Sequence, residues 1–387
     1  MLPPLNLSFD GPDAPSDRVD VSFAWGKARR TTYFSCPGHP LRKSGDALFC
    51  LGLVPAMEIG VDLHIHSPVD QALLDNGQKI QELLCRWYPG YRPVKIHAEA
   101  TTRQYPDGRG SGVFYSGGVD SSYSLADASD RLDALVTLVG ADVDIGDTRQ
   151  ASHLDGVVRQ VGARYGLEPF IVHTDIRRVS DRLVGWVEYH GALLAAVRHM
   201  LADRLENQLI ASSADESSWN RRWGSHPALD PLFGTPGARI EHHGLVDRLS
   251  KVARIIDEPD LMSNLRVCDY SVDNCGVCED CTFMLMALDV LDGFDRAPTF
   301  SRAPVDPARV RVTGEGSISD LTKLRQAFIE RKPSSPAVDY LTKAFARYDR
   351  EKLTRRWAPY DEWRRKFKRL KRQQRYRVAS RGGDGKA

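Results

Sequence analysis

The chain has 387 residues, of which 42% are hydrophobic and 27% charged, and its formal net charge is +2. This composition is typical of a folded globular protein, and the length suits one large domain with additions, or two domains. No stretch of about 18 apolar residues and no signal peptide are visible, so we expect no membrane partner. The seven cysteines do not form a secreted disulfide pattern, which predicts a cytoplasmic protein.

The first part of the chain has the pattern of a β-rich region, which we place at residues 1–108. Alternating apolar and polar residues predict paired strands there, and one helix is expected over residues 69–88. The strand-like runs are residues 19–25, 31–34, 47–51 and 61–65. A turn-rich segment at residues 105–110 marks the end of this region.

From about residue 111, apolar strands alternate with helices. The expected strands are residues 113–115, 135–139, 170–173 and 208–211, and the expected helices include 150–165 and 181–204. Fully apolar strands between helices indicate an α/β fold, with a parallel sheet and helices on both faces. We assign residues 109–300 to this domain, and ligands of such sheets bind at the carboxyl ends of the strands.

A short polar turn follows the first of these strands, with the sequence Ser116-Gly117-Gly118-Val119-Asp120-Ser121-Ser122. Two glycines allow a tight bend, the three serines add hydroxyl donors, and the next helix presents free N–H groups and its positive dipole end. Asp120 could cap that helix or help to hold Mg²⁺. The turn therefore predicts a phosphate site, and the alternative is an ordinary strand–turn–helix junction.

A second cluster contains four cysteines within fourteen residues, namely Cys268, Cys275, Cys278 and Cys281. Two-residue spacers allow several sulfurs to meet at one ion, and four thiolates suit Zn²⁺ in a closed, structural site. An iron–sulfur cluster or cysteines without a metal are the alternatives.

The 116–122 turn resembles the PP-loop of the ATP pyrophosphatase superfamily. Together with the downstream Cys-x-x-Cys-x-x-Cys, it makes residues 111–290 similar to 7-cyano-7-deazaguanine synthases (QueC-like enzymes), although the first cysteine spacer is shorter here. The resemblance implies that ATP phosphates bind at Ser116, Gly117, Gly118, Asp120, Ser121 and Ser122, and that the four cysteines hold zinc. It implies a ligase that adenylates a carboxylate such as a 7-deazaguanine acid, releases pyrophosphate, and passes the acyl group to ammonia or an amine.

The sequence suggests roles for several further residues, and for some of them an alternative remains. Adenine is expected near Leu138, Val139 and Gly140. Asp215 could hold Mg²⁺ or orient the nucleophile, or cap the next helix. Lys251 lies where related enzymes carry a lysine near the phosphates, and the alternative is a solvated surface lysine. The loop 223–230 could bind the acceptor or pack, and His190 is expected in the core.

The last part of the chain, residues 301–387, is expected to be a helical basic extension in which aromatic residues are interleaved. It could bind nucleic acid or an acidic protein, or it could be a solvated helix with its aromatic stripe packed on the domain. Two other functions are open: a tRNA-modifying PP-loop enzyme and a non-catalytic, zinc-stabilised nucleotide-binding module. An oligomer is compatible with the sequence.

Overall fold

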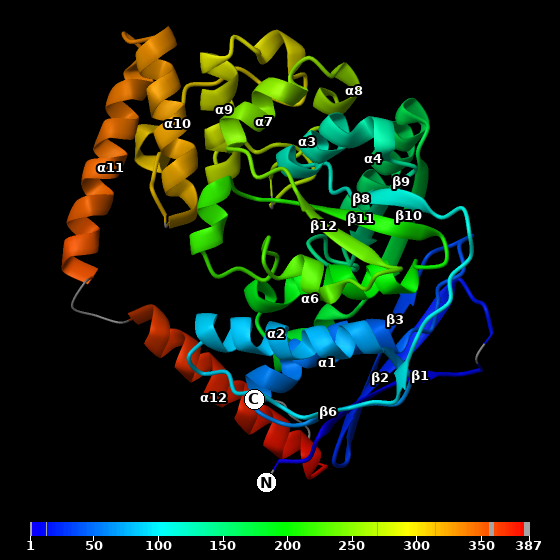
Figure 1. Cartoon of the computed structure of the whole chain (residues 1–387). Coiled ribbons are helices and arrows are strands. Elements are labelled where there is room, and N and C mark those ends of the chain that lie inside the picture. Colours follow the sequence, from blue (N-terminus) through cyan, green and yellow to red (C-terminus); the bar gives the residue numbers. More distant parts are fainter. Residues whose placement is uncertain (1, 13, 269, 314, 356–359, 383–387) are drawn as a thin grey trace.

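The protein is an α/β structure built on one large, mostly parallel sheet (Figure 1). The computed structural model describes residues 2–12, 14–268, 270–313, 315–355 and 360–382. Among these residues, ten strands pair in the order β12-β11-β8-β9-β10-β3-β2-β1-β4-β6. The strands are β1 (Leu5–Asp10), β2 (Arg18–Trp25), β3 (Ala28–Ser35), β4 (Leu63–Ile65), β5 (Val69–Asp70), β6 (Ile96–His97), β7 (Ala100–Thr101), β8 (Gly110–Phe114), β9 (Ala134–Val139), β10 (Glu168–Thr174), β11 (Leu205–Ala211) and β12 (Arg239–His243).

Helices cover both faces of the parallel half of the sheet, as the sequence predicts. The helices are α1 (Gly45–Ile59), α2 (Gln71–Trp87), α3 (Val119–Ala128), α4 (Thr148–Tyr165), α5 (Arg177–Leu183), α6 (Trp186–Met200), α7 (Arg248–Ile255), α8 (Pro259–Met262), α9 (Glu279–Val290), α10 (Glu315–Arg331), α11 (Pro336–Arg355) and α12 (Tyr360–Ser380). Successive side chains of β9 belong to different hydrophobic cores. Val136 belongs to the core that contains residues of α1 and α6, and Leu135 belongs to the core that contains residues of α3 and α4. Alternation along a strand explains this division, because neighbouring residues point to opposite faces.

The N-terminal strands extend the same sheet. Strands β8 to β12 run parallel to one another, and β3 then pairs antiparallel with β10, with His173 opposite Ser35. Strands β3, β2 and β1 continue as an antiparallel meander. The sheet is therefore continuous across the boundary that the sequence suggests near residue 108.

The expected strand at residues 47–51 is wrong, because these residues lie in α1. All fifteen residues of α1 are buried, between the sheet and α6. A helix that is apolar on every side shows no helical periodicity, so its sequence reads like a buried strand. The helix begins where Ser44 accepts a hydrogen bond from the Asp46 N–H, and it ends at Gly60 in the left-handed conformation.

The single helix expected over residues 181–204 is two helices. Helix α5 ends at Leu183, Val184 is extended, and Gly185 is the N-cap of α6. Glycine is a weak helix former, so it permits this break. The apolar pattern continues through the break, which explains why the sequence indicates one long helix.

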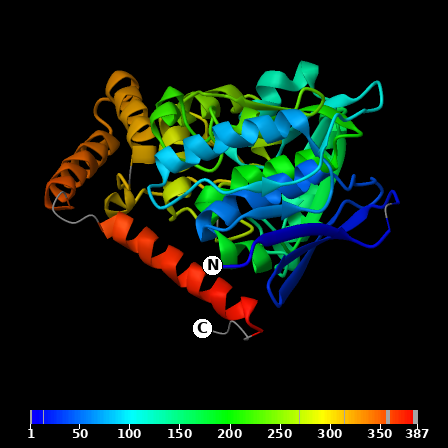
Figure 2. The same ribbon diagram turned by 60° about the horizontal axis from the view of Figure 1, so that its bottom comes forward.

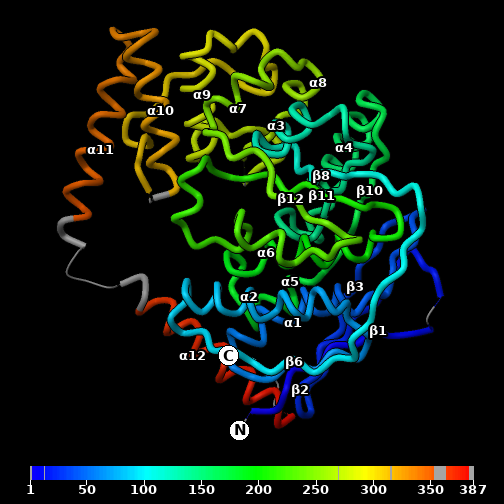
Figure 3. The backbone as a smooth tube through the Cα atoms, viewed as in Figure 1, coloured from blue at the N-terminus to red at the C-terminus, as the bar shows by residue number. Residues whose placement is uncertain are grey.

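The basic extension is helical, as expected, and it folds back on the body. Helices α10 and α11 form a hairpin beside α9, and α12 runs along α1 and the N-terminal strands (Figures 1 and 2). The indole of Trp25 stacks on the ring of Tyr376 with centroids 5.0 Å apart. The backbone trace shows that the first strands and the last helix lie side by side (Figure 3). No helix in the described residues is long and apolar enough to cross a membrane.

Candidate functional site

The 116–122 turn joins the carboxyl end of β8 to α3. Gly117 has a φ of +76°, a conformation that glycine adopts without strain. The Ser116 N–H donates to Ser121 Oγ at 3.2 Å, and Ser121 Oγ donates to the Gly118 carbonyl, which holds the bend. No side chain caps the first turn of α3, so its N–H groups are available to an anion.

A cavity of about 390 Å³ opens at this turn. Four of the expected phosphate residues line it, namely Ser116, Gly118, Asp120 and Ser121, and Gly117 lines a small adjoining cavity. Ser122 is fully buried behind the turn and lines neither cavity. The cavity therefore opens onto the 116–122 turn at the start of α3.

The strand next to β8 shapes another wall of the cavity. Leu138 lines it, whereas Val139 packs into the core on the α3 side, and Gly140 lies outside the lining. Gly140 has a φ of +103°, and a Cβ there would overlap the Thr174 carbonyl oxygen. Gly140 therefore permits the close approach of the ends of β9 and β10 beside the cavity.

Lys251 is buried rather than solvated. It lies on α7, its side chain is 1% exposed, and its Nζ donates to Asp120 Oδ1 at 2.8 Å and to the Ser212 carbonyl at 2.5 Å. Lys251 does not line the cavity. It ties Asp120 on α3 to the end of β11, and so acts on the site through Asp120.

Arg248, one turn before Lys251, is a cation of the cavity wall that sequence reasoning missed. Its guanidinium donates to Asp280 at 2.6 Å and lies 3.8 Å from Asp120 and 3.9 Å from Asp320. Burial lowers the pKa of Arg248, but these three carboxylates outweigh burial and raise it. The partners lie far apart in sequence, so no local pattern could have marked Arg248.

Arg266 is a second cation that the sequence did not reveal. The backbone N–H of Arg266 donates to the Gly117 carbonyl at 3.0 Å, and the guanidinium donates to the Gln150 side chain and to the Ser271 carbonyl. Its side chain lines the main cavity and the small cavity beside Gly117. Its position two residues before Cys268 was the one available signal.

Asp215 caps a short helix. It accepts from the Ser217 N–H at 3.0 Å and from Ser319 Oγ on α10 at 2.5 Å. Burial raises the pKa of Asp215, but the hydrogen bonds from Ser217 and Ser319 outweigh burial and lower it. Ser213, not Asp215, lines the cavity. The structure therefore shows the capping role, and the contact brings α10 to the edge of the site.

Part of the cavity wall is aromatic. Trp186 and Trp223 line it on either side of His190, whose ring centroid lies 5.8 Å and 5.7 Å from theirs. Burial lowers the pKa of His190, which favours the neutral imidazole. A Cβ at Gly191 would overlap the Gly224 carbonyl oxygen, and a Cβ at Gly224 would overlap the Val187 carbonyl oxygen. The backbone of the loop 223–230 therefore lies directly on α6. His190 is half-buried and belongs to the cavity wall, so it is not simply the core histidine that the sequence suggests.

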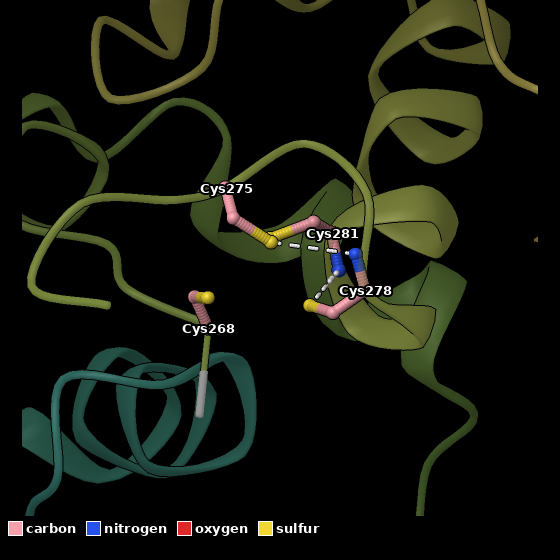
Figure 4. Close-up of side chains that lie close together, drawn as sticks. All are labelled: Cys268, Cys275, Cys278 and Cys281. Atoms are coloured by element: carbon pink, nitrogen blue, oxygen red, sulfur yellow. Dashed lines mark hydrogen bonds between the residues drawn. The ribbon is translucent and has the colours of Figure 1, made fainter. Parts of the chain in front are cut away.

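The four cysteines form a cluster that could hold a metal ion such as zinc (Figure 4). Their sulfur atoms all lie within 4.8 Å of one another, and Cys275 Sγ lies 3.9 Å from Cys281 Sγ. Tetrahedral zinc with Zn–S bonds of about 2.3 Å places sulfurs about 3.8 Å apart, so the donor set fits. Burial raises the pKa of Cys275, but the N–H groups of Val277 and Cys278 outweigh burial and lower it to about 7.

The cysteine cluster is part of the cavity wall. Cys268 lines the cavity, and Asp280, between Cys278 and Cys281, is the carboxylate that binds Arg248. A metal ion held by the four thiolates would therefore fix two segments that contact the 116–122 turn and its cations. No protein-family model matches the chain, and no curated protein matches it.

Proposed function

We propose that the protein is an ATP-dependent ligase that adenylates a carboxylate, releases pyrophosphate, and passes the acyl group to ammonia or an amine. The observation that carries this proposal is the cavity at the carboxyl ends of β8 and β9. There, an uncapped helix N-terminus and two arginines, Arg248 and Arg266, converge on one glycine-containing turn. Such a combination suits a polyphosphate, because both the N–H groups and the guanidinium groups stabilise negative charge.

In this proposal the substrate carboxylate attacks the α-phosphorus of ATP. A carboxylate oxygen–phosphorus bond forms, the bond between the α-phosphorus and the bridging oxygen breaks, and its electron pair leaves on pyrophosphate. Arg248 and Arg266 would stabilise this charge as it develops. Asp120 lines the cavity, and only its Oδ1 accepts from Lys251, so it is the residue that would contribute a ligand to Mg²⁺.

The second half of the reaction joins the acyl group to nitrogen. Ammonia or an amine attacks the acyl carbon, the carbon–oxygen bond to AMP breaks, and the nitrogen loses a proton to water. The protein contributes mainly by holding the two reactants in position. The aromatic walls at Trp186 and Trp223 favour a flat acceptor ring, and they support a 7-deazaguanine acid as the substrate.

Zinc would have a structural role here. Four thiolates complete a tetrahedral shell and leave no position for substrate, so the ion would supply no chemistry to the reaction. Its contribution would be to hold Cys268 and Asp280 against the cavity.

ATP–pyrophosphate exchange tests the proposal. The assay uses a panel of carboxylates that includes 7-carboxy-7-deazaguanine, and it compares wild type, Arg248→Gln and Asp120→Ala. We expect wild type to catalyse exchange with at least one carboxylate, and we expect the exchange rate to fall about 10²-fold in either variant. Arg248→Gln removes a positive charge that would stabilise the leaving pyrophosphate, and Asp120→Ala removes the carboxylate that would contribute a ligand to Mg²⁺. Asp130→Ala is the matched control, because Asp130 is an exposed carboxylate ten residues after Asp120. Absence of exchange with every carboxylate, or full exchange in Asp120→Ala, would contradict the proposal.

A further inference from the structure

Helix α12 is held on the body by one face. Arg372 forms an ion pair with Glu58 at 2.7 Å, Arg369 donates to the Glu58 carbonyl, and Gln373 donates to the Ile59 carbonyl. Tyr376 is buried, and its hydroxyl donates to the Pro3 carbonyl at 3.0 Å. Figure 2 shows α12 lying along the outside of the fold. One face of α12 is therefore fixed, and the opposite face is exposed.

The exposed face carries a stripe of large apolar side chains. Trp363, Phe367, Leu370 and Val378 are between 42% and 71% exposed. At 100° per residue, these four positions lie within about 80° of one another around the helix axis. The stripe extends over about 22 Å, at 1.5 Å per residue. Exposed apolar stripes of this kind mark interaction sites, because water contact with them is unfavourable.

Cations flank the stripe on both sides. Lys366 and Arg377 lie along one edge, Arg364 and Lys371 lie along the other, and all four residues are exposed. From Trp363 to Arg381 the sequence has ten lysines and arginines and no aspartate or glutamate. The partner of this face must therefore accept both apolar side chains and a row of positive charges.

We propose that this face of α12 is a docking surface for an anionic lipid bilayer, on which the helix lies flat. Trp, Phe and Leu enter the boundary between headgroups and acyl chains, and the flanking cations contact lipid phosphates. The expectation of no membrane partner rested on the lack of a spanning segment, and a helix that lies on the surface needs only a stripe.

The charge pattern separates this partner from the others. A second copy of the chain would bring two rows of cations together, which repel each other. A helical protein partner is usually selected by charges of both signs beside its apolar seam, and from Trp363 to Arg381 the sequence carries only positive charges. Nucleic acid would use the cations and the two aromatic rings, but Leu370 and Val378 have no stacking role.

Sedimentation of the full-length protein with vesicles tests the proposal. One vesicle preparation is phosphatidylcholine alone, and the other contains roughly one third phosphatidylserine. We expect the affinity for the anionic vesicles to be at least about tenfold higher, and to fall with added salt. The double variant Trp363→Ala/Phe367→Ala and the double variant Lys366→Gln/Lys371→Gln should each lose about tenfold in affinity.

Trp219→Ala is the matched control, since Trp219 is also more than half exposed but lies outside α12. It should bind vesicles as wild type does, and thermal unfolding should show that all variants keep the fold. The proposal is overturned if anionic vesicles bind no better than neutral ones, or if Trp219→Ala loses as much affinity as the α12 variants. It is also overturned if single-stranded RNA or an acidic peptide, and not the vesicles, binds in a manner that depends on Trp363.

Discussion

Replacement of Lys251 by methionine should destabilise the protein strongly, although it keeps the length of the side chain. Lys251 is 1% exposed and pairs with Asp120 at 2.8 Å, so Lys251→Met leaves a carboxylate and the Ser212 carbonyl without their donor. Breaking a buried pair costs about 3–5 kcal/mol. Asp120 is partly exposed, and Arg248 lies 3.8 Å away, so we expect a loss near the lower end, about 3 kcal/mol.

Urea unfolding, followed by far-ultraviolet circular dichroism, measures this loss. The control is Lys332→Met. Lys332 pairs with Asp292 at 2.7 Å and with Asp289 at 3.2 Å, and these carboxylates are 81% and 43% exposed, so the substitution should cost less than about 1 kcal/mol. In the double variant Asp120→Asn/Lys251→Met the penalties should not add, with a coupling of about 2 kcal/mol. If Lys251→Met cost no more than Lys332→Met, or if the two substitutions were additive, the buried pair would not stabilise the site as argued.

Three other outcomes follow from the structure. The purified protein should contain zinc and not iron, and Cys278→Ser should lower both zinc content and ATP affinity in calorimetry, because the cysteine cluster walls the cavity. Trp223→Ala should raise the KM for the acceptor about tenfold with the KM for ATP unchanged, since Trp223 lines the cavity beside Trp186 and His190 and is not part of the 116–122 turn; equal effects on both would contradict this. The hydrogen bond from Arg131 lowers the pKa of Glu241, so this pair stabilises the fold above about pH 4.5 and loses that effect as the pH falls through the lowered pKa. The unfolding free energy of wild type should therefore fall between about pH 6 and pH 3, and this fall should be smaller in Glu241→Gln. The difference should be less than about 1 kcal/mol, because the pair is exposed. An unchanged pH profile in Glu241→Gln would refute the assignment.

Local patterns in the sequence predicted the parallel strands, the position of the 116–122 turn and the cysteine cluster. Each of these depends on residues that are neighbours in the chain, so composition and spacing contain the information. The fully buried α1 was mistaken for a strand because burial on all sides removes the periodicity that separates the two structures.

The rest of the site depends on long-range contacts. Arg248 meets Asp120 and Asp320, which lie 128 residues before it and 72 residues after it. The place of Lys251 could be expected from the resemblance, but its burial and its pairing with Asp120 could not. Likewise, the contact of Ser319 with Asp215 brings the C-terminal extension to the site, and no local pattern in either segment predicts this contact.

The contact between Tyr376 and Pro3 joins two residues that are 373 positions apart. During synthesis the first strands leave the ribosome long before α12 exists, because the chain grows at about 5–20 residues per second. Trp25 is buried against Tyr376 in the folded protein, so until α12 has been made the ring of Trp25 lacks this partner. The face of Trp25 that Tyr376 covers therefore stays exposed until α12 has been made. A chain that stops before α12 would remain in that state.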